Sequence, residues 1–455
     1  MELQSLSNIL GPEGIITDKA LHASYTVDWT RRYTGFTSAI LLPKNTEEVS
    51  QVLKWCFAHS AALVPQGGNT GMVGGATPMN GELVLSLKRM NAIEEVDDAS
   101  GQLVTQSGTT LADVQRAAAV LGWKYGIDLS ARDSASIGGT IATNAGGSQV
   151  LRYGNTRHQL LGVEAVTGTG DIIGDLRGLT KDNTGYHLPG LLCGSEGTLA
   201  IITKARLQLV KAPEEEISIL LGFQSTDEAL AVVATVKKYI DDIQACEIFF
   251  QNGLSLVCDQ FGLNPPWEKP ANTYLLIDAG GQSGLIERVH ESPLSEFLNA
   301  SKHVALGTDT SSRKKLWQYR DLHTDAISAN GIPHKLDVTI PHGKLANFCN
   351  EIQRIVNSYG ADNELFLFGH AGDGNIHVNI LGPATKDLQV DDAVLDFVAS
   401  LGGSISAEHG VGRAKARHLY LNRTPEEITI FHKIKNAFDP AGILNPGAII
   451  DPKVG

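Results

Sequence analysis

The sequence predicts an α+β protein of more than one domain, and three observations indicate this class. Short apolar runs of strand length alternate with glycine-rich turns over residues 40–210. After residue 213, amphipathic helical patterns alternate with strand-like runs, and from residue 404 one helical pattern stands among turn residues. With 455 residues, 42% of them hydrophobic, the chain can form about two or three domains.

The elements follow in order along the chain. Apolar runs predict strands at 61–64, 82–87 and 199–202, and helical patterns predict helices at 46–60, with Thr46 as N-cap, and at 110–121. Beyond a boundary near residue 213, helices are predicted at 225–240, 341–358 and 425–438. We find no internal repeat that would suggest a solenoid or a propeller.

Composition excludes several function classes. The formal net charge of -13 argues against a surface for nucleic acid or anionic lipid. No apolar run is long enough to span a bilayer and the N-terminus lacks a secretory pattern, so we expect a cytoplasmic protein. The cysteines form no C-x-x-C pair, and we expect them to be reduced and structural: Cys56, Cys193, Cys246, Cys258 and Cys349.

Three glycine-rich segments, at residues 65–71, 136–147 and 194–203, stand in the first half of the chain. Backbone N–H groups in such loops can surround an anion such as a diphosphate. Their spacing matches neither a P-loop nor the Rossmann G-x-G-x-x-G pattern. One loop of this kind is commonly only a turn, but three in order indicate a common ligand.

Two histidines flank a tight turn later in the chain. Residues 366–379 predict a strand, a turn with Asp373 as a turn residue, and a returning strand, which brings His370 near His377. Two imidazoles can bind a metal such as zinc, and Glu408, beside His409, can supply a carboxylate. The spacing alone favours structural hydrogen bonding of the two histidines over metal binding.

Two basic residues precede this turn. Residues 317–324 form a helical pattern in which Arg320 and Thr324, four apart, share a face, so together they can hold a carboxylate. Residues 335–340 alternate as a strand with Lys335, Asp337 and Thr339 on its polar face. Taken alone, Arg320 and Lys335 fit solvated surface charges.

The glycine-rich segments resemble the FAD-binding domain of vanillyl-alcohol oxidase-type flavoproteins, and the resemblance covers nearly the whole chain. It implies an N-terminal helical segment (1–35), a two-lobed FAD-binding PCMH-type domain (36–213), an α+β cap with an antiparallel sheet (214–403) and a C-terminal helical segment returning to the flavin (404–455). FAD is expected to be non-covalent, because the pyrophosphate loop holds no His or Cys. The residues implied for FAD are Pro65, Gln66, Gly67, Gly68, Asn69, Thr70, Gly71, Asp128, Ser136, Gly138, Gly139, Thr143, Asn144, Gly147, Glu196, Gly197, Ile201, Ile202 and Asn445.

The later motifs, His-x-Gly-Asp-Gly-Asn-x-His and Ala-Glu-His-Gly, are similar to the signature of FAD-linked D-2-hydroxy acid dehydrogenases. The resemblance implies that His370, His377 and Glu408 bind a divalent metal, with Zn2+ as the first choice. The branch acting on D-2-hydroxyglutarate shares the Arg, Thr, Lys and Asn spacing, whereas D-lactate enzymes typically lack this Lys and Thr. The resemblance to this branch implies substrate-binding roles for Arg320, Thr324, Lys335, Asn379 and His409, with Arg320, Lys335 and His409 as catalytic residues.

The expected reaction is oxidation of D-2-hydroxyglutarate, or of D-malate or D-lactate, to the 2-oxo acid. A bound metal would lower the pKa of the substrate hydroxyl, His409 would take its proton, and the hydride would pass to flavin N5. The family suggests electron-transfer flavoprotein or a quinone as a separate acceptor, and many of its members are homodimers. Three alternatives stay open: a D-lactate or glycolate dehydrogenase of the same family, a zinc-dependent hydrolase, and a flavin-binding protein without turnover.

Overall fold

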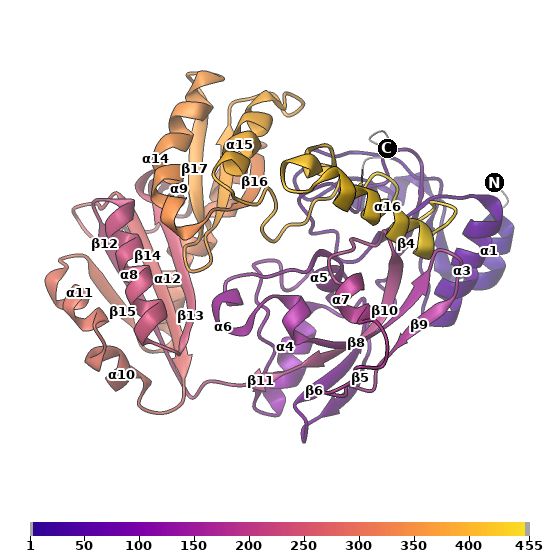
Figure 1. Cartoon of the computed structure of the whole chain (residues 1–455), viewed down its shortest axis with the longest axis horizontal. Helices are drawn as coiled ribbons and strands as arrows, with labels where there is room; N and C mark the ends of the chain where they lie inside the picture. Colours follow the sequence, from indigo (N-terminus) through magenta and orange to yellow (C-terminus); the bar gives the residue numbers. More distant parts are fainter. Residues whose placement is uncertain (1–2, 451–455) are drawn as a thin grey trace. The chain divides into compact units, whose positions relative to one another are not determined.

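The computed structural model describes residues 3–450, and these divide into two compact units. Helices and predominantly antiparallel sheets confirm the predicted α+β class (Figure 1). None of the helices in the described residues is long and apolar enough to cross a membrane. Unit 2 consists of Ser148–Tyr153 and Pro213–Ala407, and unit 1 of the described residues up to Gly147, Gly154–Ala212 and those from Glu408 onward.

The first lobe of unit 1 is a four-stranded sheet in the order β1-β2-β4-β3, in which β4 runs parallel to β2 and β3. Predicted helix 46–60 forms, but its N-cap is Asn45 rather than Thr46, because the Asn45 side chain accepts from the N–H of Glu48. The elements are α1 (Leu3–Leu10), η1 (Pro12–Gly14), β1 (Ile15–Ile16), η2 (Lys19–Leu21), α2 (Ala23–Thr26), β2 (Ile40–Leu41), α3 (Thr46–His59), β3 (Leu63–Gln66) and β4 (Leu83–Ser86).

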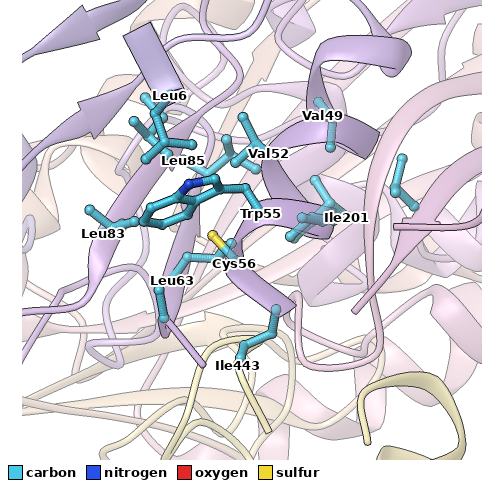
Figure 2. Packing of buried hydrophobic residues seen from close by; sticks show 14 of the residues in the cluster. Leu6, Val49, Val52, Trp55, Cys56, Leu63, Leu83, Leu85, Ile201 and Ile443 are labelled. Atoms are coloured by element: carbon cyan, nitrogen blue, oxygen red, sulfur yellow. The ribbon is translucent and has the colours of Figure 1, made fainter. Parts of the chain in front are cut away.

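The core of this lobe joins distant parts of the chain. Figure 2 shows the Trp55 indole among side chains that include Leu6 from the first helix and Ile443 from the C-terminal segment. The N–H of Leu63 donates to the carbonyl of Ile443 at 2.9 Å, and the N–H of Asn445 donates to the carbonyl of Leu63 at the same distance. The C-terminal segment is therefore fastened to β3, the strand that enters the first glycine-rich segment.

The second lobe of unit 1 is a five-stranded antiparallel sheet in the order β5-β6-β10-β8-β9, with its own apolar core. The predicted helices 110–121 and 425–438 form as α4, capped by Thr110, and α16. The elements are β5 (Ile93–Asp97), β6 (Gln102–Gln106), α4 (Leu111–Val120), β7 (Trp123–Lys124), α5 (Ile137–Thr143), η3 (Thr156–Gln159), β8 (Leu160–Thr167), β9 (Ile172–Asp175), α7 (Leu188–Leu192), β10 (Ala200–Gln208), β11 (Val210–Lys211), η4 (Ala416–Leu421) and α16 (Pro425–Phe438).

Unit 2 is built on a seven-stranded antiparallel sheet in the order β15-β12-β14-β13-β17-β18-β16. Helices α9, α12 and α13 cover one face through an apolar cluster that includes Phe249, Tyr274 and Phe368, whereas α15 holds His334 from the other face. The elements are α6 (Val150–Tyr153), β12 (Glu215–Phe223), α8 (Thr226–Tyr239), β13 (Ile243–Phe250), α9 (Gln251–Phe261), β14 (Thr273–Gly281), α10 (Leu285–Glu291), α11 (Leu294–Ala300), β15 (Val304–Gly307), α12 (Thr310–Asp321), α13 (His323–Ala329), β16 (His334–Thr339), α14 (His342–Ser358), β17 (Glu364–His370), β18 (Asn375–Leu381) and α15 (Gln389–Ser400).

Candidate active site

The first glycine-rich segment leaves β3 and is tied to the chain by its side chains. The Gln66 amide donates to the carbonyl of Ala76, and the Asn69 amide donates to that of Val27, each at 3.0 Å. Within residues 3–450, none of the backbone N–H groups of residues 67–71 donates to another group of the chain. A short loop of unpaired N–H donors fits an anion such as the diphosphate of FAD.

Two glycines of this segment let it pack closely against the second one. A Cβ on Gly68 would lie 1.9 Å from the carbonyl oxygen of Ser134, and one on Gly67 would lie 2.1 Å from the Oγ of Ser136. A Cβ on Gly71 would meet nothing within 4 Å. Gly67 and Gly68 are therefore required by packing, whereas Gly71 borders open space that a ligand can use.

The second segment forms a helix, α5, where we predicted a loop. Ser136 caps it by accepting a hydrogen bond from the N–H of Gly139 at 3.3 Å, and the N–H of Gly138 donates to the carbonyl of Ser107 at 2.8 Å. These first N–H groups are thus paired inside the protein. The diphosphate therefore fits the first segment better than the start of α5.

The third segment contributes a buried carboxylate, Glu196, that contacts the motif loop, which is the loop that begins at Glu408. The Glu196 carboxylate accepts hydrogen bonds from the N–H groups of Val411, at 2.7 Å, and Gly412, at 2.8 Å. Burial raises the pKa of Glu196 to about 7, although these two amides and the Lys415 ammonium act to lower it. The Asn445 amide donates to the Glu196 carbonyl at 2.8 Å. Glu196, predicted for FAD, therefore positions the loop after residue 408, and Asn445, also predicted for FAD, binds the backbone of Glu196.

The remaining residues predicted for FAD lie in or beside the same segments. A Cβ on Gly197 would lie 2.3 Å from the Cγ of Pro65, so the first and third segments touch. The Thr143 hydroxyl donates to the carbonyl of Gly139 at 3.0 Å, and the Asn144 Oδ1 accepts from the N–H of Arg157 at 3.0 Å. Thr70 stands in the first segment, Asp128 bridges to Gly147, and Ile201 and Ile202 pair with Val166 and Ala165 in β10 and β8.

Glu408 and His409 begin the last part of unit 1, directly after Ala407 of unit 2. The Glu408 carboxylate accepts a hydrogen bond from the N–H of Gly147 at 2.6 Å, and the Nε2 of His409 lies 4.0 Å from the other carboxylate oxygen. A Cβ on Gly147 would lie 2.0 Å from the carbonyl of Asp128. The predicted metal carboxylate is thus fastened to the end of the second glycine-rich segment.

The predicted histidine hairpin is confirmed in unit 2. Strands β17 and β18 pair so that His370 lies opposite Asn375 and Phe368 lies opposite His377. The two histidines are diagonal neighbours on one face, with ring centroids 5.2 Å apart and ring planes at 84°. Asp373 acts as the expected turn residue, since its Oδ1 accepts from the N–H of Asn375 at 3.1 Å.

Each histidine has a buried carboxylate beside its Nδ1. Glu247 lies opposite His370 in the sheet, with Oε1 2.7 Å from Nδ1, and Asp337 lies opposite His377, with Oδ1 3.2 Å from Nδ1. A carboxylate hydrogen-bonded to one ring nitrogen, as Glu247 is to His370, orients a histidine so that its other nitrogen, Nε2, can bind a metal. The contact between Asp337 and His377 has an ion-pair distance without the angle of a hydrogen bond. Two imidazoles this close together fit zinc or a similar ion.

Glu247 belongs to no motif recognised in the sequence, although it stands in the apolar strand run 243–250. A charged residue in such a run was the available signal, because a fully buried carboxylate is rare unless it is paired. Burial alone would raise the pKa of Glu247, but its interactions with His370 and Arg320 outweigh burial and hold this pKa below its usual value. Glu247 is therefore an anion at neutral pH.

Arg320 is buried beside this carboxylate, with 7% of its surface exposed. Its Nε lies 2.8 Å from the Oε2 of Glu247, an ion pair without the angle of a hydrogen bond, and its guanidinium lies 4.7 Å from the centroid of the Phe368 ring. Within residues 3–450, neither terminal nitrogen of Arg320 donates to a protein group. A buried guanidinium with such unpaired donors fits a carboxylate ligand.

The continuous helix predicted over residues 317–324 is wrong. Helix α12 ends at Asp321, and Leu322, with ψ -3°, separates it from α13, which begins at His323. This ψ value lies in the bridge region and interrupts the helical hydrogen-bond ladder. Arg320 and Thr324 therefore belong to two successive helices rather than to one face of a single helix.

Lys335 and Asn379 lie directly opposite each other in β16 and β18, as the predicted strand at 335–340 implies. Because of alternation they share a sheet face with Asp337 and His377. Burial lowers the pKa of the Lys335 ammonium to about 8, although the Asp325 charge acts to raise it. Lys335 thus remains mainly protonated at neutral pH. Unit 2 therefore contains two cations among the predicted substrate residues, Arg320 and Lys335.

Comparisons with known proteins agree with this arrangement. Residues 37–174 match the model of an FAD binding domain, and residues 212–449 match that of the C-terminal domain of FAD linked oxidases. The chain is 35% identical to D-2-hydroxyglutarate dehydrogenase of Stutzerimonas stutzeri, over 98% of both chains. It is 34% identical to the mitochondrial D-2-hydroxyglutarate dehydrogenase of Danio rerio, over 97% of this chain and 84% of that one.

Solved structures support the fold. A 4-ethylphenol oxidase from Gulosibacter chungangensis superposes with a TM-score of 0.79 at 19% identity, over 100% of this chain and 97% of that one. A p-cresol methylhydroxylase superposes with a TM-score of 0.78 at 16% identity, over 99% and 96% of the two chains. These likenesses confirm the PCMH-type flavoprotein fold.

Proposed function

The chain belongs to the family of FAD-dependent D-2-hydroxyglutarate dehydrogenases, and we propose that it oxidises D-2-hydroxyglutarate to the 2-oxo acid with the help of a divalent metal. The observation that carries the proposal is the buried guanidinium of Arg320. Its terminal donors have no protein partner within the described residues, so a carboxylate of the substrate is the natural ligand.

A second carboxylate needs a second cation, and Lys335 provides it. Lys335 lies opposite Asn379, a residue that is 2% exposed, on the sheet face that carries His377. Thr324 stands in the first turn of the helix that follows Arg320 and can add a hydroxyl. D-lactate has one carboxylate and a methyl group, so it can pair with only one of the two cations. This asymmetry favours a dicarboxylate such as D-2-hydroxyglutarate, and D-malate is the shorter candidate.

We assign the metal to His370, His377 and Glu408, and Zn2+ fits this set because imidazole and carboxylate are its usual ligands. The hydrogen bond between Glu247 and the Nδ1 of His370, which directs Nε2 of this histidine away from Glu247, supports this assignment. When bound, such a metal supplies a positive charge that lowers the pKa of a coordinated hydroxyl.

The proton and the hydride leave the substrate separately. When bound, FAD supplies the acceptor for the C2 hydride. His409, which follows the metal carboxylate in sequence, takes the hydroxyl proton, and Asn379 orients the substrate. The hydride carries two electrons and one proton away from C2, the hydroxyl loses the second proton, and the 2-oxo acid remains. We further propose that the electrons pass to electron-transfer flavoprotein or to a quinone.

Substrate choice tests this proposal. The wild-type protein and the Lys335→Met variant are compared by kcat/KM for D-2-hydroxyglutarate, D-malate, D-lactate and glycolate, with an artificial electron acceptor. Lys238→Met, which removes an exposed lysine, is the control. We expect wild type to prefer D-2-hydroxyglutarate and Lys335→Met to lower that preference over D-lactate by about 10- to 100-fold, as for loss of a charged hydrogen bond. Wild-type preference for D-lactate or glycolate would contradict the proposal.

A further inference from the structure

We propose that Glu247 is a positioning residue that holds the substrate-binding arginine and a metal-binding histidine in one fixed arrangement. This inference rests on the proposed function, because it takes the roles of Arg320 and His370 from there. It adds a residue that neither the motifs nor the similarity to relatives singles out.

The two oxygens of the Glu247 carboxylate serve different partners. Oε1 lies 2.7 Å from the Nδ1 of His370, and Oε2 lies 2.8 Å from the Nε of Arg320. The side chain of Glu247 is 1% exposed, so water does not replace either partner. The same carboxylate therefore sets the positions of two groups that come from β17 and from α12.

Each contact has a directional consequence. A carboxylate at Nδ1 fixes the tautomer of His370, so that Nε2 presents its lone pair to a metal, and it makes this nitrogen a stronger ligand. The contact at Nε of Arg320, together with the Phe368 ring 4.7 Å from the guanidinium, leaves the two terminal nitrogens to receive a carboxylate. Loss of Glu247 should therefore affect metal binding and substrate binding together.

A second arginine of α12 provides a matched comparison. Arg313 lies seven residues before Arg320, about two helical turns away. Its terminal nitrogen lies 3.1 Å from the carboxylate of Asp278 in β14, whose side chain is 2% exposed. Asp278 also accepts from the Ser218 hydroxyl and from the Trp317 indole N–H, neither of which we place in the site. Each pair thus joins an arginine of α12 to a buried carboxylate, Glu247 in one and Asp278 in the other, but only the Glu247 pair contains a predicted substrate residue and contacts a predicted metal residue.

The test uses the full-length, FAD-loaded protein and the variants Glu247→Gln, Glu247→Asp and Asp278→Asn. Three quantities are measured: the Kd for Zn2+ by competition with a chelator, KM and kcat for D-2-hydroxyglutarate, and Tm. We expect Glu247→Gln to weaken Zn2+ binding and to raise KM, each by about 10-fold or more, as for loss of an outer-shell carboxylate. Glu247→Asp, which keeps the charge, should recover part of both effects.

Asp278→Asn should lower Tm while leaving the Zn2+ Kd and KM within about twofold of wild type. If Glu247→Gln lowers Tm in the same way and changes neither Kd nor KM, the inference is wrong and Glu247 is only structural. If Glu247→Gln does not fold, Glu247→Asp decides by the same two quantities. If D-2-hydroxyglutarate does not reduce the wild-type flavin, the proposed function fails, and the Zn2+ measurement still decides whether Glu247 supports His370.

Discussion

The Glu408 carboxylate accepts a hydrogen bond from the N–H of Gly147 at 2.6 Å, although 261 residues separate the two in the sequence. Gly147 closes the second glycine-rich segment, and Glu408 begins the motif loop that also carries His409. Both belong to unit 1. The residue assigned to the metal is therefore positioned by a segment assigned to the flavin.

Two substitutions of Glu408 separate these roles. Glu408→Gln keeps an oxygen that can accept from Gly147, so we expect normal FAD content, with Zn2+ affinity lowered by more than the roughly 10- to 100-fold that loss of an outer-shell partner costs. Glu408→Ala loses both functions and should also lower FAD occupancy. FAD is measured by absorbance and zinc by elemental analysis. Equal FAD loss in both variants would show that the hydrogen bond to Gly147 does not position the segment.

The glycines of the first segment should differ in what they support. Gly68→Ala forces a Cβ to within 1.9 Å of a carbonyl oxygen and should lower the stability of the apoprotein by about 1–3 kcal/mol. Gly71→Ala has open space and should leave apoprotein stability unchanged while weakening FAD binding. Chemical denaturation and FAD titration measure the two effects, with Gly343→Ala in α14 as the control. A Gly71→Ala apoprotein as unstable as the Gly68→Ala one would contradict the assignment.

Lys335 should limit the reaction at alkaline pH. Its pKa is lowered to about 8, so the ammonium is lost as pH rises through this value, and the neutral amine no longer pairs with the second carboxylate. The kcat/KM ratio of D-2-hydroxyglutarate to D-lactate should therefore fall above pH 8, and Lys335→Arg should keep it constant to higher pH. Groups whose titration affects both substrates equally cancel in this ratio. A flat wild-type ratio between pH 7 and pH 10 would rule out this role.

Glu196 should make stability depend on pH. Its pKa is raised from 4.5 to about 7 in the folded chain, so the folded state holds the proton more tightly than the unfolded state. This difference in proton binding adds to the free energy of unfolding. The contribution, roughly 3 kcal/mol at most, is fully present below pH 4.5 and is lost as pH rises through 7. As pH rises from 4.5 to above 7, the unfolding free energy of the wild-type protein should therefore fall relative to that of Glu196→Gln. Denaturation at several pH values measures it, and a constant difference would refute the prediction.

Much of the fold could be predicted from local patterns. The histidine hairpin followed from alternation and a Gly-Asp-Gly turn, because a period of two fixes which side chains share a face. The helical pattern at 110–121 also predicted a helix correctly, whereas the predicted N-cap Thr46 was wrong by one residue, because Asn45 accepts the capping hydrogen bond. The three glycine-rich segments were found by their glycine content, but their spacing did not reveal that residues 137–143 form a helix. Glycine is a poor helix former, and tertiary packing decided the outcome here.

The parts of the site that could not be predicted depend on long-range pairing. Glu247 reaches His370 only because β13 and β17 are neighbours in the sheet, and strand order cannot be read from the sequence of either strand. The break between α12 and α13 falls at Leu322, and neither a proline nor a glycine marks it in the sequence. Asp337 was placed on the correct face, yet its contact with His377 required the register of β16 on β18.

The most direct test of the proposed function is rapid anaerobic mixing of the FAD-loaded protein with D-2-hydroxyglutarate while the flavin absorbance is followed. We predict fast bleaching with this substrate, much slower bleaching with D-lactate, and loss of the reaction after chelation of the metal, with recovery when Zn2+ is added. A flavin spectrum that D-2-hydroxyglutarate leaves unchanged, or bleaching that is unaffected by metal removal, would contradict the account.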